Sequence, residues 1–242
     1  MGWLSKIETI IGDNSPNEDI IPLPSDVKTF YIQYNKSFQM PEGRDFYIYD
    51  IFNYKASQIR KVLNSGKTPI GYVSSQFEDF RPDSHLFDPS WFIGGLDGWQ
   101  GEFILHPRHL DKVLPIMEQR FLLMRKKGFK IADIDNIDVY HYHASEGDAK
   151  TCAKYWNMMA EIARGMGLQV GLKNSAFLFG KVDPDICITE SAFVYNEIES
   201  YLRFNVPVLN TEYSRMPYEK ALRDNRVHSL LKRKLPMDAW EG

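Results

Sequence analysis

The chain has 242 residues, of which 43% are hydrophobic and 25% charged, a composition typical of folded globular proteins and not of disordered ones. Its 29 basic and 32 acidic residues give a net charge of −3, which argues against nucleic acid or an anionic membrane as a partner. Two cysteines, Cys152 and Cys187, are too few for a disulfide framework, and they form no zinc pattern.

The first 28 residues are predicted to be a lead-in to one folded domain. Their apolar residues recur at helical spacing and predict a short amphipathic helix that packs against the domain: Trp3, Leu4, Ile7, Ile10 and Ile11. No stretch reaches the roughly 20 apolar residues of a membrane span, and no secretory leader is recognisable. We therefore assign residues 1–28 to the lead-in and 29–242 to the domain, and expect no membrane partner.

Eight short runs rich in apolar, β-branched and aromatic residues follow the lead-in and predict strands. They span residues 30–34, 45–52, 68–75, 130–136, 169–174, 186–193, 207–214 and 227–232, the last being the weakest. Continuous apolar runs, rather than strict alternation, are typical of parallel strands that are covered on both faces.

Helical patterns separate these runs. The clearest begins at Leu110, reaches Met124 and ends at Gly128, a C-cap, while a second starts after Asp148 and ends at Gly165 or Gly167. Shorter helices are expected near residues 57–63, 196–204 and 218–223. Strands that alternate with helices indicate a parallel sheet, and eight of them favour a single (β/α)₈ TIM barrel of the α/β class. The alternative is a doubly wound open sheet, but no glycine-rich phosphate loop follows any strand.

Residues 76–107 form a long insertion after the third strand. Loops of this length in compact domains are usually lids or binding loops, and loops after barrel strands lie on the catalytic face. We expect the segment to fold over the barrel mouth and to present Trp91, Phe92 and Trp99 to a ligand. The alternative is a packed loop whose rings are buried.

Polar residues end several of the predicted strands, at the face where barrel active sites form. They are Asp50, Asp135, Asn136, Asp138, Lys173, Asn174, Glu190 and Glu212. A buried polar group is costly unless it is paired or functional, and several at one barrel mouth predict an active site. Paired carboxylates suit glycoside hydrolysis, because one donates a proton while the other, ionised, supports or attacks the sugar.

A metal site is the competing interpretation. Asp133, Asp135 and Asp138 could offer oxygen ligands to Mg²⁺ or Ca²⁺, and spacing alone does not decide. His141 and His143 would share a face if their segment were extended, but no third ligand is evident. We therefore expect no metal and no other cofactor.

Six motifs in order resemble those of glycoside hydrolase family 114, the endo-α-1,4-polygalactosaminidases. They lie at Tyr72–Asp83, Leu96–Glu102, Asp133–Tyr140, Gly171–Asn174, Thr189–Phe193 and Asn210–Tyr213. The resemblance covers nearly the whole chain and implies a (β/α)₈ barrel that cleaves α-1,4-linked galactosamine polymers. It further implies a catalytic Asp on the fourth strand and a catalytic Glu on the sixth.

The catalytic pair implied by the resemblance maps to Asp135 and Glu190. The family's Glu-Pro-Asp-Asn is Asp-Ile-Asp-Asn at 133–136 here, and its Asn-Glu-Gln-Cys is Thr-Glu-Ser-Ala at 189–192. The residues predicted to bind substrate are Asp50, Tyr72, Trp99, Asn136, Asp138, Lys173, Asn174, Glu212 and Tyr213.

The predicted partner is thus a polysaccharide or oligosaccharide, and we expect retaining, endo-acting cleavage. A cleft lined by these acids would attract the amines of a deacetylated aminosugar polymer. If the polymer is an exopolysaccharide, the enzyme acts outside the cell. Two alternatives remain open: a carbohydrate-binding barrel that has lost catalysis through the altered motif neighbours, and a metal-dependent hydrolase.

Overall fold

The computed structural model describes residues 29–34, 37–142 and 147–231. The amphipathic helix predicted near the N-terminus and the imidazole of His143 lie outside the described residues.

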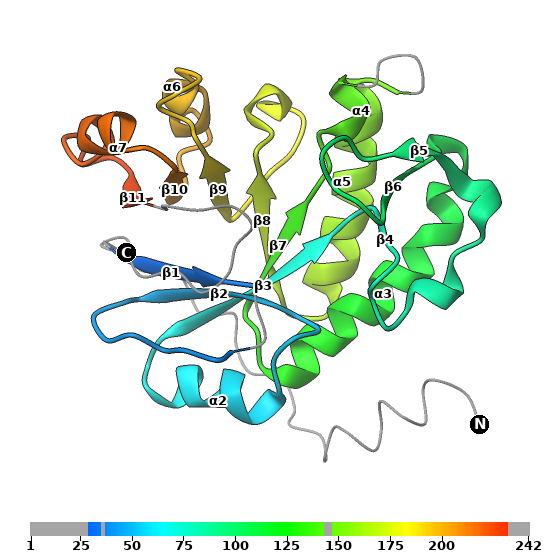
Figure 1. Cartoon of the computed structure of the whole chain (residues 1–242), viewed down its shortest axis with the longest axis horizontal. Coiled ribbons are helices and arrows are strands. Elements are labelled where there is room, and N and C mark those ends of the chain that lie inside the picture. The colour runs from blue at the N-terminus through cyan, green and yellow to red at the C-terminus, as the bar shows by residue number, and fades with distance from the viewer. Residues whose placement is uncertain (1–28, 35–36, 143–146, 232–242) are drawn as a thin grey trace.

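Eight parallel strands form a nearly closed barrel (Figure 1). In chain order they are β1 (Phe30–Gln33), β2 (Phe46–Asp50), β3 (Thr68–Ser74), β7 (Ile131–Asp135), β8 (Gln169–Lys173), β9 (Ile186–Glu190), β10 (Val208–Glu212) and β11 (His228–Leu231). Each strand pairs with the next in this order, and β1 contacts β11 across the seam. All eight predicted strands are therefore confirmed, including the last one, for which the sequence signal was weakest.

The barrel interior is filled by alternate residues of its strands. Phe30 and Ile32 of β1, like Ile186 and Ile188 of β9, belong to one interior cluster with six further buried apolar residues. The residues between them, such as Cys187, pack in a second cluster beneath the helices. Because side chains alternate with a period of two, this register decides which strand-end residues face the barrel mouth.

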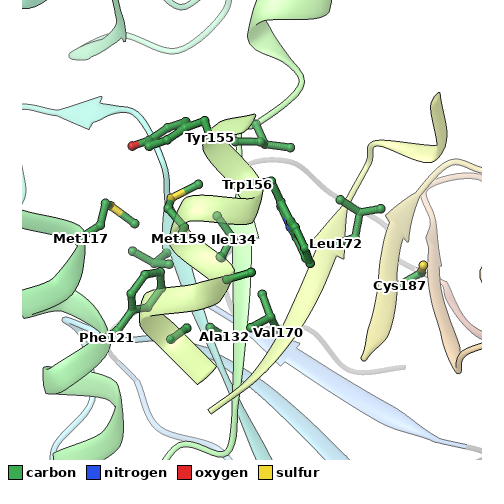
Figure 2. Packing of buried hydrophobic residues seen from close by; sticks show 14 of the residues in the cluster. Met117, Phe121, Ala132, Ile134, Tyr155, Trp156, Met159, Val170, Leu172 and Cys187 are labelled. Carbon is green, nitrogen blue, oxygen red and sulfur yellow. The ribbon is translucent and has the colours of Figure 1, made fainter. Parts of the chain in front are cut away.

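Helices cover the outside of the barrel. They are α2 (Ala56–Asn64), α3 (Leu110–Lys127), α4 (Val139–Tyr142), α5 (Ala149–Gly165), α6 (Ile198–Leu202) and α7 (Arg215–Ala221). Trp156 and Met159 of α5 pack against Phe121 of α3 and against β7 and β8 (Figure 2). Within the described residues, no helix is long and apolar enough to cross a membrane.

The two longest helices begin and end at the residues that the sequence indicates. Gly128 follows α3 with φ of 99°, a left-handed C-cap that few other residues adopt without strain. Asp148 caps α5 by accepting a hydrogen bond of 2.8 Å from the backbone N–H of Thr151. These caps explain why both helices were predictable from local sequence.

The segment between β3 and α3 folds into a small antiparallel sheet beside the barrel. Its strands are β4 (Phe77–Glu78), β5 (Phe92–Gly95) and β6 (Glu102–Leu105), in the order β4, β6, β5, with three short 3₁₀ turns, η1 (Ser84–Leu86), η2 (Pro89–Trp91) and η3 (Pro107–His109). Gly98 and Gly101 take φ of 82° and 85° in the turn that joins β5 to β6. These backbone angles lie in the left-handed region, so both positions favour glycine.

A buried ion pair fixes this small sheet to the barrel. Arg120 of α3 binds both carboxylate oxygens of Asp83, at 2.7 and 3.0 Å, and donates to the Ser74 carbonyl at 2.9 Å. Both charged side chains are almost completely buried. The guanidinium thus joins the end of β3, the segment after β4 and helix α3.

We expect Arg120→Met to lower the free energy of unfolding by about 3–5 kcal/mol, because it leaves the buried Asp83 carboxylate without its cation. Urea unfolding followed by circular dichroism measures this, with Lys154→Met on the exposed face of α5 as the control. A loss for Arg120→Met no larger than for the control would contradict the anchoring role.

Candidate active site

A pocket of about 450 Å³ opens at the C-terminal ends of the strands. It is lined by strand-end residues of the barrel and by residues of the small sheet: Tyr34, Asp50, Asn53, Tyr72, Glu78, Phe80, Arg81, Trp99, Glu102, Asp135, Asn136, Asp138, Asn174 and Glu190. The small sheet therefore forms part of the wall, at the place where a barrel carries its active site.

Three adjacent strands end in the same way. Asp135, Lys173 and Glu190 are the last residues of β7, β8 and β9, and each is followed by a residue with positive φ: Asn136 at 60°, Asn174 at 46° and Ser191 at 58°. Non-glycine residues rarely adopt this conformation, and it concentrates where function imposes it. The sharp turn ends each strand just after its charged side chain has entered the pocket region.

The two asparagines also hold the carboxylate-bearing strand ends in place. The backbone N–H of Asn136 donates to Oδ1 of Asp135 at 2.9 Å, and its side chain donates to Ser74 at 3.0 Å. Oδ1 of Asn174 accepts a hydrogen bond of 2.9 Å from the backbone N–H of Glu190. Asn136 and Asn174 therefore position the pair, in addition to lining the pocket.

Lys173 lies between the two predicted catalytic carboxylates. Its Nζ is 3.1 Å from Oε1 of Glu190, 3.6 Å from Oδ2 of Asp135 and 4.0 Å from Oδ2 of Asp133. Burial alone would lower the pKa of this ammonium, but Asp135 and Glu190 outweigh burial and hold the pKa well above its usual value. The lysine is thus a permanent cation beneath the pocket.

The shared ammonium limits how far apart the two carboxylates lie. The distance between their nearest oxygens cannot exceed the sum of the two distances from Nζ to these carboxylates. That span includes the separation of about 5–5.5 Å found in retaining glycosidases and reaches only the lower end of the range of about 6.5–9.5 Å in inverting ones.

Further acidic and phenolic groups surround the pair. Tyr213 donates a hydrogen bond of 2.6 Å to Oε2 of Glu190. Burial, and then the charge of Asp135, raises the pKa of Asp138 to about 7. Burial likewise raises the pKa of Asp133 to about 7 although Lys173 opposes the shift. Neutral carboxyl groups and carboxylates therefore coexist around Lys173 near pH 7.

Two predicted substrate-binding acids have other environments. Asp50 lines the pocket, but its Oδ2 is 2.5 Å from Nη1 of Arg81 and its Oδ1 accepts two backbone N–H groups. Glu212 does not line the pocket: Leu209 faces the barrel interior, so Glu212, three residues on, points to the opposite side. There its Oε1 accepts from the backbone N–H of Phe193 at 3.0 Å. The expectation that both acids line the cleft is therefore wrong for Glu212. Asp50 does line the pocket, but its charge is paired with that of Arg81.

The remaining predicted residues divide between the pocket wall and the layer beneath it. Tyr72, Trp99 and Asp138 line the wall, whereas Lys173 and Tyr213 reach the pocket through the carboxylates that they contact. Trp99 is 50% exposed. Trp91 and Phe92 instead pack against the hydrophobic core, so of the three predicted rings only Trp99 faces the pocket.

Sequence reasoning missed six pocket residues. They are Tyr34, Asn53, Glu78, Phe80, Arg81 and Glu102. Three of them, Glu78, Phe80 and Arg81, fall within one of the motifs that carry the family resemblance, and Glu102 ends another. The position of these motifs was therefore the available signal.

The chain is helical around His141 as far as Tyr142, so it lacks there the extended conformation in which two imidazoles would share a face. His141 lies in α4, and its ring stacks on Phe177 at 4.1 Å between centroids. Among the described residues, no three His, Cys, Asp or Glu side chains are grouped to hold a metal ion. Cys152 and Cys187 are buried, and burial raises the pKa of each thiol to about 12.

A carboxylate pair at the mouth of a (β/α)₈ barrel is the arrangement of a glycoside hydrolase. The model of glycoside-hydrolase family GH114 matches residues 13–240, and the chain belongs to this family. It is a glycoside hydrolase by that membership, and the resemblance seen in the sequence is confirmed.

Solved structures share the fold. Ega3 of Aspergillus fumigatus, in complex with galactosamine, superposes with a TM-score of 0.81 at 24% identity, over 90% of this chain and 95% of that one. The glycoside hydrolase domain of PelA from Pseudomonas aeruginosa gives 0.67 at 11% identity, over 85% and 94%. No curated protein sequence matches the chain.

We expect Lys173→Met to raise the apparent pKa values of Asp133 and Asp138 above about 7, because both carboxyl groups lose the cation whose charge lowers their pKa. Carboxyl chemical shifts followed by ¹³C NMR against pH measure this, and Lys181→Met, an exposed lysine outside the pocket, is the control. Unchanged titration in Lys173→Met would show that the ammonium does not set these charges.

Proposed function

We propose that the protein is a retaining, endo-acting glycosidase that cleaves α-1,4-linked galactosamine-containing polysaccharide. The observation that carries this proposal is the placement of Asp135 and Glu190 at one pocket, on either side of the Lys173 ammonium. Family membership supplies the reaction class, and the upper limit that Lys173 sets on the carboxylate separation covers the spacing of retaining enzymes.

In the first chemical step, Asp135 attacks the anomeric carbon while Glu190 donates its proton to the glycosidic oxygen. The bond to the leaving sugar breaks, and its electron pair goes to that oxygen, which takes the proton. In the second step Glu190 removes a proton from water, the water oxygen attacks the same carbon, and Asp135 departs as a carboxylate. Tyr213 and Lys173 hold Glu190 in place throughout.

The substrate class is supported by two observations. Acidic side chains line the pocket from both the barrel and the small sheet, which suits a cationic aminosugar and disfavours an anionic glycan. The relative Ega3 forms a complex with galactosamine. The exposed rings of Phe80 and Trp99 offer apolar faces on which sugar C–H groups can pack.

The competing function is a barrel that binds oligosaccharide without cleaving it. Reducing ends released from partially deacetylated α-1,4-galactosaminan distinguish the two. Steady release, with products several sugars long at early times, supports the endo-glycosidase. Binding of the polymer without new reducing ends would favour the alternative.

We expect Glu190→Gln to lower turnover by about 10²–10⁴-fold, because the amide can neither donate nor accept the required proton. Asp135→Asn should lower it at least as much, since the nucleophile is lost. The reducing-end assay measures both, and Glu161→Gln on the exposed surface of α5 is the control. Near-normal turnover in either site variant, with an unchanged melting temperature, would refute the assignment.

We also expect Trp99→Ala to lower kcat/KM by about tenfold on long oligomers and by less on the shortest cleaved oligomer, because binding energy from remote sugars contributes to the reaction. Rates on oligomers of increasing length test this. Leu222→Ala, an exposed apolar side chain outside the pocket wall, is the control. An equal loss on every chain length would argue against a remote sugar contact.

A further inference from the structure

Glu102 is a pocket residue of the small sheet, directly opposite a second glutamate. It begins β6 and pairs across the antiparallel ladder with Glu78 of β4. Only 8% of Glu102 is exposed, and it is part of the pocket wall. Like charges at directly opposite positions destabilise a pair of strands, so this arrangement needs a reason.

The nearby cation, Arg81, forms ion pairs with two other carboxylates. Arg81 donates to both oxygens of Glu78, each at 2.7 Å, and its Nη1 binds Asp50 at 2.5 Å. The one guanidinium therefore serves two carboxylates. None of the hydrogen bonds or ion pairs among the described residues involves the Glu102 carboxyl, which borders the pocket.

The electrostatic surroundings of Glu102 are acidic. Burial, followed by the charge of Glu78, raises the pKa of Glu102 to about 7. Asp135 on β7 and Asp79 beyond β4 act in the same direction, and Arg81 opposes them. A nearly buried carboxyl group that accepts no hydrogen bond and lies among other acids destabilises the folded protein. A bound cation would offset this destabilisation.

We propose that Glu102 binds the ammonium group of an unacetylated galactosamine unit and thereby selects deacetylated over acetylated polymer. The inference rests on the proposed function for its ligand class. The ammonium supplies the donors that Glu102 lacks, and a charge-assisted bond in a partly desolvated pocket is strong. An N-acetyl group at the same position is neutral, bulkier and leaves the carboxylate without a cation.

If the Glu102 carboxyl serves to bind a ligand, it should lower the stability of the folded protein when no ligand is bound. The pKa of Glu102 lies above the ordinary value of 4.5, so the folded state holds the proton more tightly than the unfolded state. Its contribution to stability is therefore lost as pH rises from about 4.5 to about 7. Glu102→Gln should accordingly raise the melting temperature at pH 8 by several degrees and have a much smaller effect at pH 4.

Calorimetric titration tests the ligand. An α-1,4-linked galactosamine trimer and its fully N-acetylated counterpart are titrated into Asp135→Asn and into the double variant Asp135→Asn, Glu102→Gln, neither of which turns the ligand over. We expect Glu102→Gln to weaken the amine trimer at least about tenfold and to leave the acetylated trimer within about twofold. Adding Glu161→Gln instead should change neither affinity.

Equal losses for both trimers, equal affinities with and without Glu102, or no binding of the amine trimer would each overturn the proposal. A melting temperature that does not rise at pH 8 would also overturn it, because the carboxyl would then already have a partner. Binding that depends on Glu102 in a protein that releases no reducing ends would support the amine site while contradicting the proposed hydrolysis.

Discussion

The buried ammonium of Lys173 is the interaction on which the site depends. Strand β8 lies between β7 and β9 in the barrel, so its last residue stands between the carboxylates that end its two neighbours. Three carboxylates lie within 4.0 Å of the same Nζ. Without that cation they would repel one another in a poorly solvated place, and their spacing would not be maintained. The barrel topology and the charge of one lysine together limit the separation of Asp135 and Glu190, the proposed catalytic pair.

The second structural constraint is the strand register. Alternation with a period of two places Asp133 and Asp135 of β7, Lys173 of β8 and Glu190 of β9 on the side of the barrel interior. Positive φ at the next residue of each strand ends the ladder at that point. The same alternation turns Glu212 of β10 away, although it ends its strand at a similar height. One register shift in any of these strands would dismantle the site.

The fold was predictable because its signals are local. Apolar runs gave the strands, and Asp148 and Gly128 gave the ends of the two long helices. The strand ends and the family motifs together predicted that Asp135 and Glu190 lie at one pocket, as they do. Contacts between residues distant in the chain were not predictable. Arg81 pairs with Asp50, 31 residues away, and no local sequence pattern indicates such a pairing. For the same reason the sequence could not predict that Glu102 lacks an ion-pair partner, because this depends on which carboxylates Arg81 binds.

The stereochemistry of cleavage tests the central claim most directly, because it depends on the spacing that Lys173 imposes. ¹H NMR of the products within the first moments of hydrolysis, before mutarotation, identifies the anomer that forms at the new reducing end. Attack by Asp135 followed by attack by water inverts the anomeric carbon twice, so an α-linked galactosamine oligomer should first yield the α anomer. Initial release of the β anomer would show a single displacement by water and would contradict the account.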